Sequence, residues 1–357
     1  MILLHEFEDE MITCTMCGFC RQVCPALEER GWESYAPRGL VSIGYGLLRR
    51  GLHPTKAMID SVFACTTCGR CVAKCPPQTK IRDIVLATRA VLFQGKSTPK
   101  SVTKLLSNLA RTGNIYGRTR NKLAQKHSAA VYFPGCNIRY RHPEILKSSI
   151  TLLNRVGVNT VVMEGADCCG APALLAGNLG QFHNIARANS SWIDTTRLIF
   201  SCPIGLQTMK EEYRETKGSA SASHLTEVLS QAIGSIHFRE TSETVTYHDP
   251  CYLARMLKVV DPPRSLLSSV PELRFVEMAD SKENTRCCGS GAGITEQSTP
   301  TLSREIAATR IKQAREVGAE RIITSCPYCL DQLRKVSDGL PVDEISVFLA
   351  SRLQSSH

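Results

Sequence analysis

The sequence lacks any long hydrophobic run. Hydrophobic residues make up 43% of its 357 positions, but no apolar stretch approaches the ~18 residues that a membrane-spanning helix requires. The start of the chain turns acidic at Glu6, and it has neither the basic region nor the apolar core of a secretory signal. We therefore expect a cytoplasmic protein that contacts a membrane only through a partner.

Acidic side chains are missing from a long internal segment. Between Asp83 and Glu144 there is no carboxylate, whereas the same segment contains eleven basic residues: Arg89, Lys96, Lys100, Lys104, Arg111, Arg118, Arg120, Lys122, Lys126, Arg139 and Arg141. Aromatic residues are also scarce, at 6% of the chain, and the segment matches no nucleic-acid-binding motif, so we expect no nucleic-acid partner. The segment is either a solvated connector or a surface that docks an acidic partner, an anionic membrane surface or an acidic substrate.

Cysteine, in contrast, is abundant and clustered. The chain has 17 cysteines, an odd number. Disulfides are rare in a reducing cytoplasm, and it is small secreted domains that usually need them. All 17 fall into short groups or matched single positions, which scattered core cysteines would not do. The cysteines therefore predict metal ligation.

Eight of these cysteines form two copies of one spacing. The copies are Cys14-x2-Cys17-x2-Cys20-x3-Cys24-Pro25 and Cys65-x2-Cys68-x2-Cys71-x3-Cys75-Pro76. This is the spacing of bacterial two-cluster ferredoxins, in which the fourth cysteine ligates the other cluster. Zinc sites usually use separated cysteine pairs, so zinc is disfavoured here. The sequence predicts two [4Fe–4S] clusters, one held by Cys14, Cys17, Cys20 and Cys75 and the other by Cys65, Cys68, Cys71 and Cys24.

The chain divides into a helical part and two repeats. Residues 1–95 are predicted to be mostly helical, with helices over 37–51 and 81–93, and 96–128 form a basic linker. From residue 129 short apolar runs alternate with amphipathic stretches, which is typical of β-α units around a parallel sheet. The pattern occurs twice, over 129–235 and 236–357. The predicted fold class is α+β: an α-helical ferredoxin domain followed by two related α/β domains with small parallel sheets.

Each C-terminal repeat contains the same cysteine pattern. A single cysteine follows an expected strand, a vicinal pair precedes a glycine, and a Cys-Pro follows another expected strand. Such positions lie at strand ends near helix N-termini, where thiolates are stabilised and where α/β sheets bind ligands. A vicinal pair cannot easily chelate one tetrahedral ion, so a multinuclear centre is favoured. The first repeat offers Cys136, Cys168, Cys169 and Cys202, and the second offers Cys251, Cys287, Cys288, Cys326 and Cys329.

This pattern resembles the cysteine-rich CCG domain of heterodisulfide reductases, which also occurs in glycolate and lactate oxidase iron–sulfur subunits and in thiol:fumarate reductase. The second repeat matches it completely, whereas the first has Gly205 in place of the last cysteine. A dicluster ferredoxin domain followed by two such domains resembles the D-type subunit of heterodisulfide reductase and the glycolate oxidase iron–sulfur subunit over essentially the whole chain. The resemblance implies a non-cubane [4Fe–4S] centre at the complete motif. It leaves the first motif with either a further cluster or zinc, or with neither.

The resemblance implies that the ferredoxin clusters pass electrons to this centre, which reduces a small disulfide or oxidises thiols at Cys251, Cys287, Cys288, Cys326 and Cys329. His248, three residues before Cys251, is a candidate proton donor or a loop brace, as is Tyr328. Arg286 either binds an anionic substrate or pairs with a surface carboxylate. Since no flavin or nicotinamide site is evident, we expect a protein redox partner: a cytochrome b-type membrane subunit, a flavoprotein subunit or a ferredoxin.

Two other functions stay open from the sequence. The chain could be an electron-transfer subunit, with no chemistry of its own, of a flavin-dependent glycolate or lactate dehydrogenase. Alternatively, zinc could stabilise the repeats as a scaffold, with only the ferredoxin part redox-active. At four irons per cluster, about eight irons per chain without zinc would indicate the first alternative. About eight with zinc would indicate the second, and about twelve or more would place a cluster in the repeats.

Overall fold

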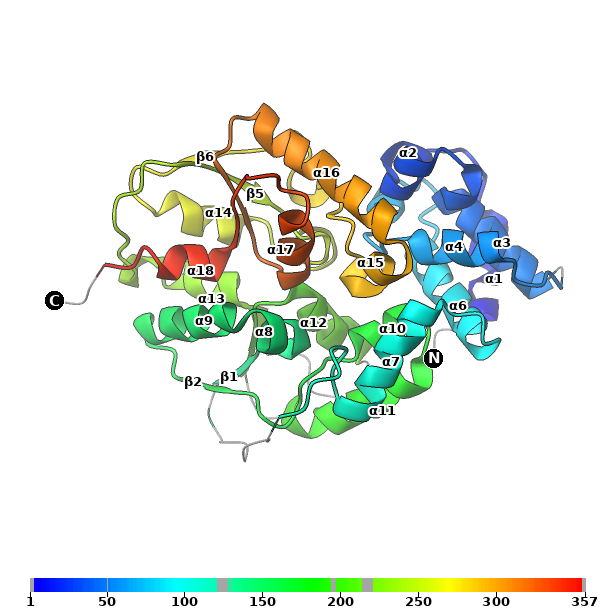
Figure 1. Cartoon of the computed structure of the whole chain (residues 1–357), viewed down its shortest axis with the longest axis horizontal. Coiled ribbons are helices and arrows are strands. Elements are labelled where there is room, and N and C mark those ends of the chain that lie inside the picture. Colours follow the sequence, from blue (N-terminus) through cyan, green and yellow to red (C-terminus); the bar gives the residue numbers. More distant parts are fainter. Residues whose placement is uncertain are drawn as a thin grey trace.

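The computed structural model describes residues 3–49, 51–120, 128, 130–193, 197–213 and 221–354. Its N-terminal part is helical (Figure 1). The helices are α1 (Glu8–Thr13), α2 (Pro25–Arg30), α3 (Pro37–Arg49), α4 (Lys56–Ala64), α5 (Arg70–Ala73), α6 (Ile81–Gln94) and α7 (Lys100–Thr112). Proline opens α2 and α3, where its missing N–H has no helical partner to lose. The structure therefore contains the helices expected at 37–51 and 81–93, and residues 100–112 of the expected linker form helix α7.

Two four-stranded parallel sheets follow, and they have the same strand order. The first is β2-β1-β3-β4 and the second is β6-β5-β7-β8. The strands are β1 (Ala130–Phe133), β2 (Thr160–Val162), β3 (Arg197–Phe200), β4 (Ala222–His224), β5 (Thr244–His248), β6 (Arg274–Val276), β7 (Arg321–Thr324) and β8 (Val342–Glu344). The repeat seen in the sequence is a structural repeat, and the expected α+β fold is confirmed.

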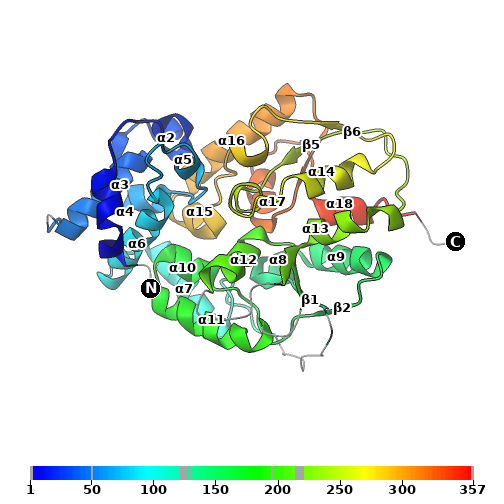
Figure 2. The same cartoon turned by 180° about the vertical axis from the view of Figure 1, so that it is seen from behind.

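The helices of the two repeats also correspond. The first repeat contains α8 (Gly135–Arg141), α9 (Pro143–Arg155), α10 (Ala171–Ala176), α11 (Leu179–Ile193), α12 (Pro203–Gln207) and α13 (Leu225–Gln231). The second contains η6 (Tyr252–Met256), α14 (Asp261–Ser268), α15 (Ile294–Ser298), α16 (Pro300–Glu316), α17 (Pro327–Arg334) and α18 (Ile345–Ala350). Helix α9 packs on α18 and α13 on α14, as Figure 1 and Figure 2 show. These reciprocal contacts relate the repeats by an approximate two-fold axis.

One hydrophobic core runs through all three parts of the chain. It joins Phe63 and Leu86 of the helical part to Phe200 of the first repeat and Ile306 of the second. Ten cysteines are buried in this core: Cys68 of the ferredoxin motifs and all nine cysteines of the two repeats. A second core lies between the two sheets, around Tyr132 and Tyr247. The cysteine motifs therefore lie where the helical part and both repeats meet.

Much of the basic segment is part of this framework. Arg89 is fully buried, Arg120 pairs with Asp167 at 2.9 Å and also with Glu164, and Arg141 pairs with Asp331 at 3.1 Å. Lys122 and Lys126 lie outside the described residues. Apart from Arg141, the exposed basic residues in the described part of the segment lie on α7, beside it or after it: Lys96, Lys100, Lys104, Arg111 and Arg118. Docking of an acidic partner on this segment stays a prediction, restricted to those residues.

No helix in the described part of the chain combines the length and apolarity needed to cross a membrane.

Candidate functional site: a row of cysteine cavities

The ferredoxin cysteines gather into the two sets expected from the spacing. Cys20 is buried beside Cys14, Cys17 and Cys75, and burial raises the pKa of its thiol. Cys17 is exposed, and it is the one exposed cysteine among the 17, all of which are described. The first set therefore reaches the protein surface.

The second set lines a cavity with an empty volume of about 450 Å³. Its sulfur-bearing walls come from Cys65, Cys68 and Cys71 together with Cys24 from the first copy of the motif. Burial, followed by the neighbouring Cys68, Cys65 and Cys24, raises the pKa of the Cys71 thiol. Cys20 of the first set is also among the groups that act on Cys71, so the two sets are adjacent.

The backbone of both ferredoxin loops is shaped to surround an anionic group. Met16 and Thr67 adopt positive φ values of 55° and 53°, and Gly18 and Gly69 adopt 87° and 72°. Non-glycine residues rarely take this conformation. Alternating right- and left-handed residues turn successive N–H groups into a concavity that binds anions such as iron–sulfur clusters. Four thiols and such a backbone in each set fit a [4Fe–4S] cluster.

The complete motif of the second repeat converges on one cavity with an empty volume of about 310 Å³. Its lining contains all five cysteines, which are Cys251, Cys287, Cys288, Cys326 and Cys329. The elements follow the expected pattern. Cys326 follows β7 and is the N-cap residue of α17, and Cys251 follows β5 and is the N-cap residue of η6. All five are buried. Five thiols around one enclosed space exceed the four that a tetrahedral zinc ion uses and fit a multinuclear iron–sulfur centre.

The glycine after the vicinal pair is required by close packing. Gly289 has φ +85°, and a Cβ placed there would lie 2.2 Å from the carbonyl oxygen of Ser303. Its N–H donates to the Cys287 sulfur at 3.3 Å. Gly170 is equivalent in the first repeat, with φ +81° and an N–H 3.4 Å from the Cys168 sulfur. The Cys-Cys-Gly motif therefore combines two thiols with a left-handed turn.

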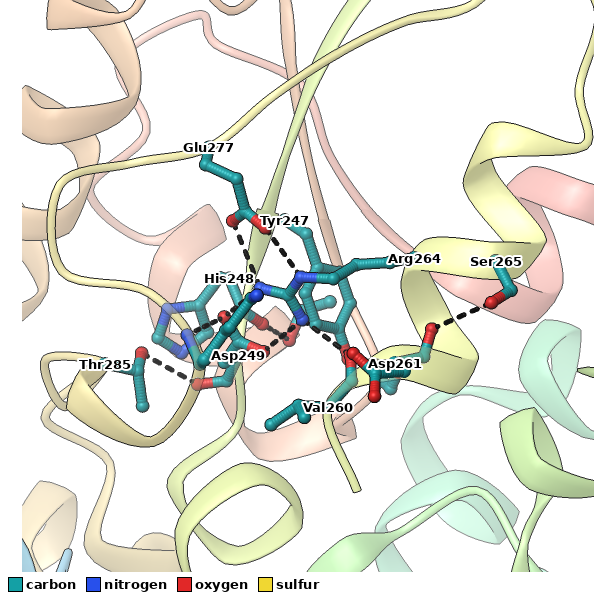
Figure 3. Close-up of polar contacts among 12 residues, drawn as sticks. Tyr247, His248, Asp249, Val260, Asp261, Arg264, Ser265, Glu277 and Thr285 are labelled. Atoms are coloured by element: carbon teal, nitrogen blue, oxygen red, sulfur yellow. Dashed lines mark hydrogen bonds and ion pairs between the residues drawn. The ribbon is translucent and has the colours of Figure 1, made fainter. Parts of the chain in front are cut away.

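The loop that carries Cys251 is held by Asp249. Figure 3 shows the Asp249 carboxylate facing Arg264, which donates to both of its oxygens at 2.9 Å. The backbone carbonyl of Asp249 accepts a hydrogen bond from Thr285 at 3.0 Å, just before Cys287. Asp249 is 1% exposed. This cluster ties the single cysteine and the vicinal pair of the second motif to each other.

The first repeat forms a smaller set of ligands. Cys136, Cys169 and Cys202 line a cavity with an empty volume of about 390 Å³, and Cys168 contacts Cys136. At the place of the fifth cysteine, a Cβ added to Gly205 would lie 3.7 Å from the Cys169 sulfur. The backbone therefore still has the geometry of the complete motif, and four thiols remain there to hold a cluster or zinc.

The cavities are contiguous. The thiol of Cys68, in the second ferredoxin set, lies against that of Cys287, and this contact lowers the pKa of Cys68. Thr66 lines the cavity of the second repeat. That cavity shares Ile204, Ala292 and Tyr328 with the cavity of the first repeat. The row thus runs from the surface at Cys17 through both ferredoxin sets to the motifs of the two repeats.

The other residues singled out in the sequence have the following surroundings. His248 is 1% exposed, beside Cys288 and Cys329. Tyr328 separates the two repeat cavities. Arg286 forms an ion pair with Glu28 and lies 3.7 Å from Asp280, which matches its interpretation as a partner of carboxylates.

The sequence does not indicate the roles of three buried arginines. Arg89 donates to the carbonyls of Cys65 and Leu175 at 2.6 and 2.8 Å, which joins the second ferredoxin set to the first repeat. Arg255 donates to the Cys68 carbonyl at 2.6 Å. Arg310 contacts His248. No spacing or motif marks these residues, because their partners are mostly backbone carbonyls from distant segments.

Family models match both types of domain. A 4Fe-4S dicluster domain matches residues 10–79, and a cysteine-rich domain matches 130–204 and 245–334. The chain is therefore an iron–sulfur protein with one dicluster domain and two cysteine-rich CCG domains. The resemblance inferred from the cysteine motifs is confirmed.

Relatives share this arrangement over most of the chain. The D-type subunit of dihydromethanophenazine:CoB–CoM heterodisulfide reductase from Methanosarcina acetivorans is 28% identical, covering 94% of this chain and 91% of the relative. The B-type subunit of fumarate reductase (CoM/CoB) from Methanothermobacter marburgensis is 26% identical, covering 88% of this chain and 66% of the relative. FadF of Bacillus subtilis, named a probable iron–sulfur-binding oxidoreductase, is 29% identical, and the match covers 80% of this chain and 44% of FadF. The chain is an iron–sulfur electron-transfer protein of the type represented by FadF and by the D-type subunit of heterodisulfide reductase.

A solved structure has the same fold. The crystal structure of a hypothetical protein from Helicobacter pylori superposes with a TM-score of 0.65 over 99% of this chain and 76% of that one, at 10% identity.

Proposed function

We propose that this protein is the iron–sulfur subunit of a cytoplasmic oxidoreductase that reduces a small disulfide, or oxidises the corresponding thiols. The observation that carries the proposal is the row of cavities: the five-cysteine motif of the second repeat lies directly against Cys68 of the second ferredoxin set. In that arrangement two [4Fe–4S] clusters would supply electrons singly, and the five cysteines would hold a non-cubane [4Fe–4S] centre at which a substrate sulfur binds.

The reaction needs two electrons and two protons. Reduction breaks one S–S bond, takes two electrons one at a time through the ferredoxin sets, and takes two protons to give two thiols. The chain's own part is to bury the second motif, which excludes water, and to bring Cys287 against Cys68. Electrons would be exchanged with a protein partner on the side of Cys17, because the first ferredoxin set reaches the surface there. The exposed apolar side chains of Ile12, Met16 and Phe19 lie within five residues of Cys17 in the sequence.

Metal content tests the proposal first. Anaerobically purified protein should contain about twelve or more irons per chain, with matching acid-labile sulfide, because two ferredoxin clusters account for about eight. About eight irons would contradict a cluster in the second repeat.

Cysteine variants test the place of the reaction. Cys326→Ser and Cys329→Ser should abolish the reduction of small disulfides by reduced methyl viologen, while the ferredoxin clusters stay reducible. Lys312→Ser, at an exposed position on α16 outside the cysteine cavities, is the control and should retain the activity. Full activity in the Cys326 and Cys329 variants would overturn the proposal.

One alternative stays open: an electron-transfer subunit without chemistry of its own that serves a flavin-dependent glycolate or lactate dehydrogenase. Reduction of the clusters by glycolate or lactate, in the presence of a co-purified flavoprotein, would favour that alternative. Activity toward disulfides in the isolated chain would contradict it.

A further inference from the structure

A buried histidine–arginine pair lies beside the complete motif. His248 is the last residue of β5 and is 1% exposed, and Arg310, on α16, is 0% exposed. Nε of Arg310 donates to Nδ1 of His248 at 3.2 Å. Arg310 is itself fixed, because it also donates to the carbonyl of Asp280 at 3.0 Å and to the side chain of Gln313.

This hydrogen bond determines the tautomer of His248. Arginine stays protonated in proteins and offers only donors. Nδ1 of His248 must therefore accept, so the proton of the neutral imidazole is on Nε2. The fixed positive charge of Arg310 also opposes a second proton on the ring.

The free side of the ring faces the cysteines. A ring nitrogen of His248 and the sulfurs of Cys288 and Cys329 lie within 4.8 Å of one another. Since Nδ1 is occupied by Arg310, Nε2 is the nitrogen available to them. Among the described residues, Nε2 has no hydrogen-bond acceptor of standard geometry. A buried donor without a partner is costly, and thiolate or sulfide sulfur would satisfy it.

The first repeat lacks the histidine and the fifth cysteine together. Its residue at the end of β1, three positions before Cys136, is Phe133, and the Phe133 ring packs on Phe200 at a centroid distance of 5.2 Å. Phe200 in turn lies 3.5 Å from the position of a Cβ on Gly205. Two phenylalanine rings thus lie beside the incomplete motif, whereas the imidazole of His248 lies beside the complete one.

We propose that His248 is a fixed N–H donor to the sulfur of Cys288 or Cys329 at the second-repeat centre, and that Arg310 is the positioning residue that keeps it in this tautomer. The inference rests on the proposed function, since it requires a cluster in the second motif. It excludes His248 as an iron ligand, because a protonated Nε2 has no lone pair for a metal. A donor to cluster sulfur stabilises the more negative, reduced state and raises the reduction potential.

The test is an EPR-monitored redox titration of the anaerobic holoprotein, with the ferredoxin clusters as internal standards. His248→Phe places the residue of the first repeat at this position and should keep the iron content. At a fixed potential it should lower the ratio of reduced to oxidised second-repeat centre about tenfold, a shift of about 59 mV for one electron. His248→Gln, whose amide N–H₂ can replace Nε2–H, should remain close to the wild type.

Arg310→Met provides a second variant, in case the phenylalanine disturbs folding. It keeps the imidazole but releases its tautomer, so the same ratio should fall by a smaller factor. In every variant the potentials of the ferredoxin clusters should stay unchanged.

Three results would overturn the inference. Loss of about four irons in His248→Phe would make His248 a ligand. Unchanged potentials in all three variants, with about twelve irons in the wild type, would make the histidine a brace and leave the proposed function intact. About eight irons in the wild type would remove the proposed function and this inference together.

Discussion

At the scale of single residues, two glycines explain how the motif is built and where it has changed. Gly289 has no room for a side chain, because its Cβ would lie 2.2 Å from the Ser303 carbonyl at φ +85°. Gly205 has room, since the nearest atoms to a Cβ there lie at 3.5 to 3.7 Å. The backbone therefore requires glycine at position 289. Position 205 has room for a side chain, and it is the position that a cysteine occupies in the complete motif.

Gly289→Ala should therefore destabilise the protein, and Gly205→Ala should not. A non-glycine residue in the left-handed region costs about 1 kcal/mol or more, and Ser303 must also move, so we expect a loss of about 1–3 kcal/mol for Gly289→Ala. Anaerobic unfolding by denaturant measures this loss, and the iron content of each variant is determined in parallel. Equal denaturant midpoints for Gly289→Ala and Gly205→Ala would show that the turn at Gly289 tolerates a side chain.

At the scale of elements, α6 joins the parts of the chain. Its buried Arg89 donates to the carbonyls of Val62 and Cys65 next to α4 and to that of Leu175 at the end of α10. Gly177, which follows α10, approaches the same helix so closely that an added Cβ would lie 2.4 Å from the Arg89 carbonyl carbon and oxygen. Helix α6 thus positions the second ferredoxin set against the first repeat.

Arg89→Met should cost about 2–4 kcal/mol of unfolding free energy, because it removes the arginine donor from the carbonyls of Val62, Cys65 and Leu175, at about 1–3 kcal/mol for each one left unpaired. The EPR signal of the second ferredoxin cluster should change, since the Cys65 carbonyl keeps, among the described residues, only its bond from Thr295. Arg111→Met is the matched control: Arg111 belongs to the same basic segment but is exposed, and its side chain bonds to Asn108, three residues before it on the same helix. A stability of Arg89→Met equal to that of the control would contradict this role.

At the scale of the whole molecule, the two repeats are joined by an ion pair next to the cavities. His142, between α8 and α9, lies 2.9 Å from the carboxylate of Asp331 on α17, with Arg141 and Glu144 also facing this group. Burial opposes the charge on the imidazole, but Asp331 and Glu144 outweigh it, so the pKa of His142 is raised. His142 and Asp331 thus form a contact between the two repeats.

The raised pKa makes this contact sensitive to pH. A group whose pKa is higher in the folded state contributes stability that is complete below its unfolded value, about 6.5 for histidine, and is lost as the pH rises through the folded value. Wild type should therefore be more stable than His142→Gln at pH 6, with the difference narrowing by pH 9. Thermal unfolding of both proteins across this range measures it, and a constant difference would disprove the linkage.

The sequence predicted what depends on local spacing. The helices starting at Pro37 and Ile81, the paired cysteine sets and the repeated parallel sheets all follow from periodicity, proline positions and cysteine intervals. What it could not predict depends on contacts between distant segments. The burial of Arg89, the Arg310–His248 bond and the contact between Cys68 and Cys287 join residues that no local pattern relates, so the basic segment was interpreted only as a connector or a docking surface.

The contact between Cys68 and Cys287 also bears on how the protein matures. The second repeat borders the second ferredoxin cavity, because Arg255 and Thr295 bond to the Cys68 and Cys65 carbonyls. Docking of the second repeat would therefore restrict the entry of a group as large as an iron–sulfur cluster. We expect the N-terminal part to receive its cluster most readily before the last repeat docks on it.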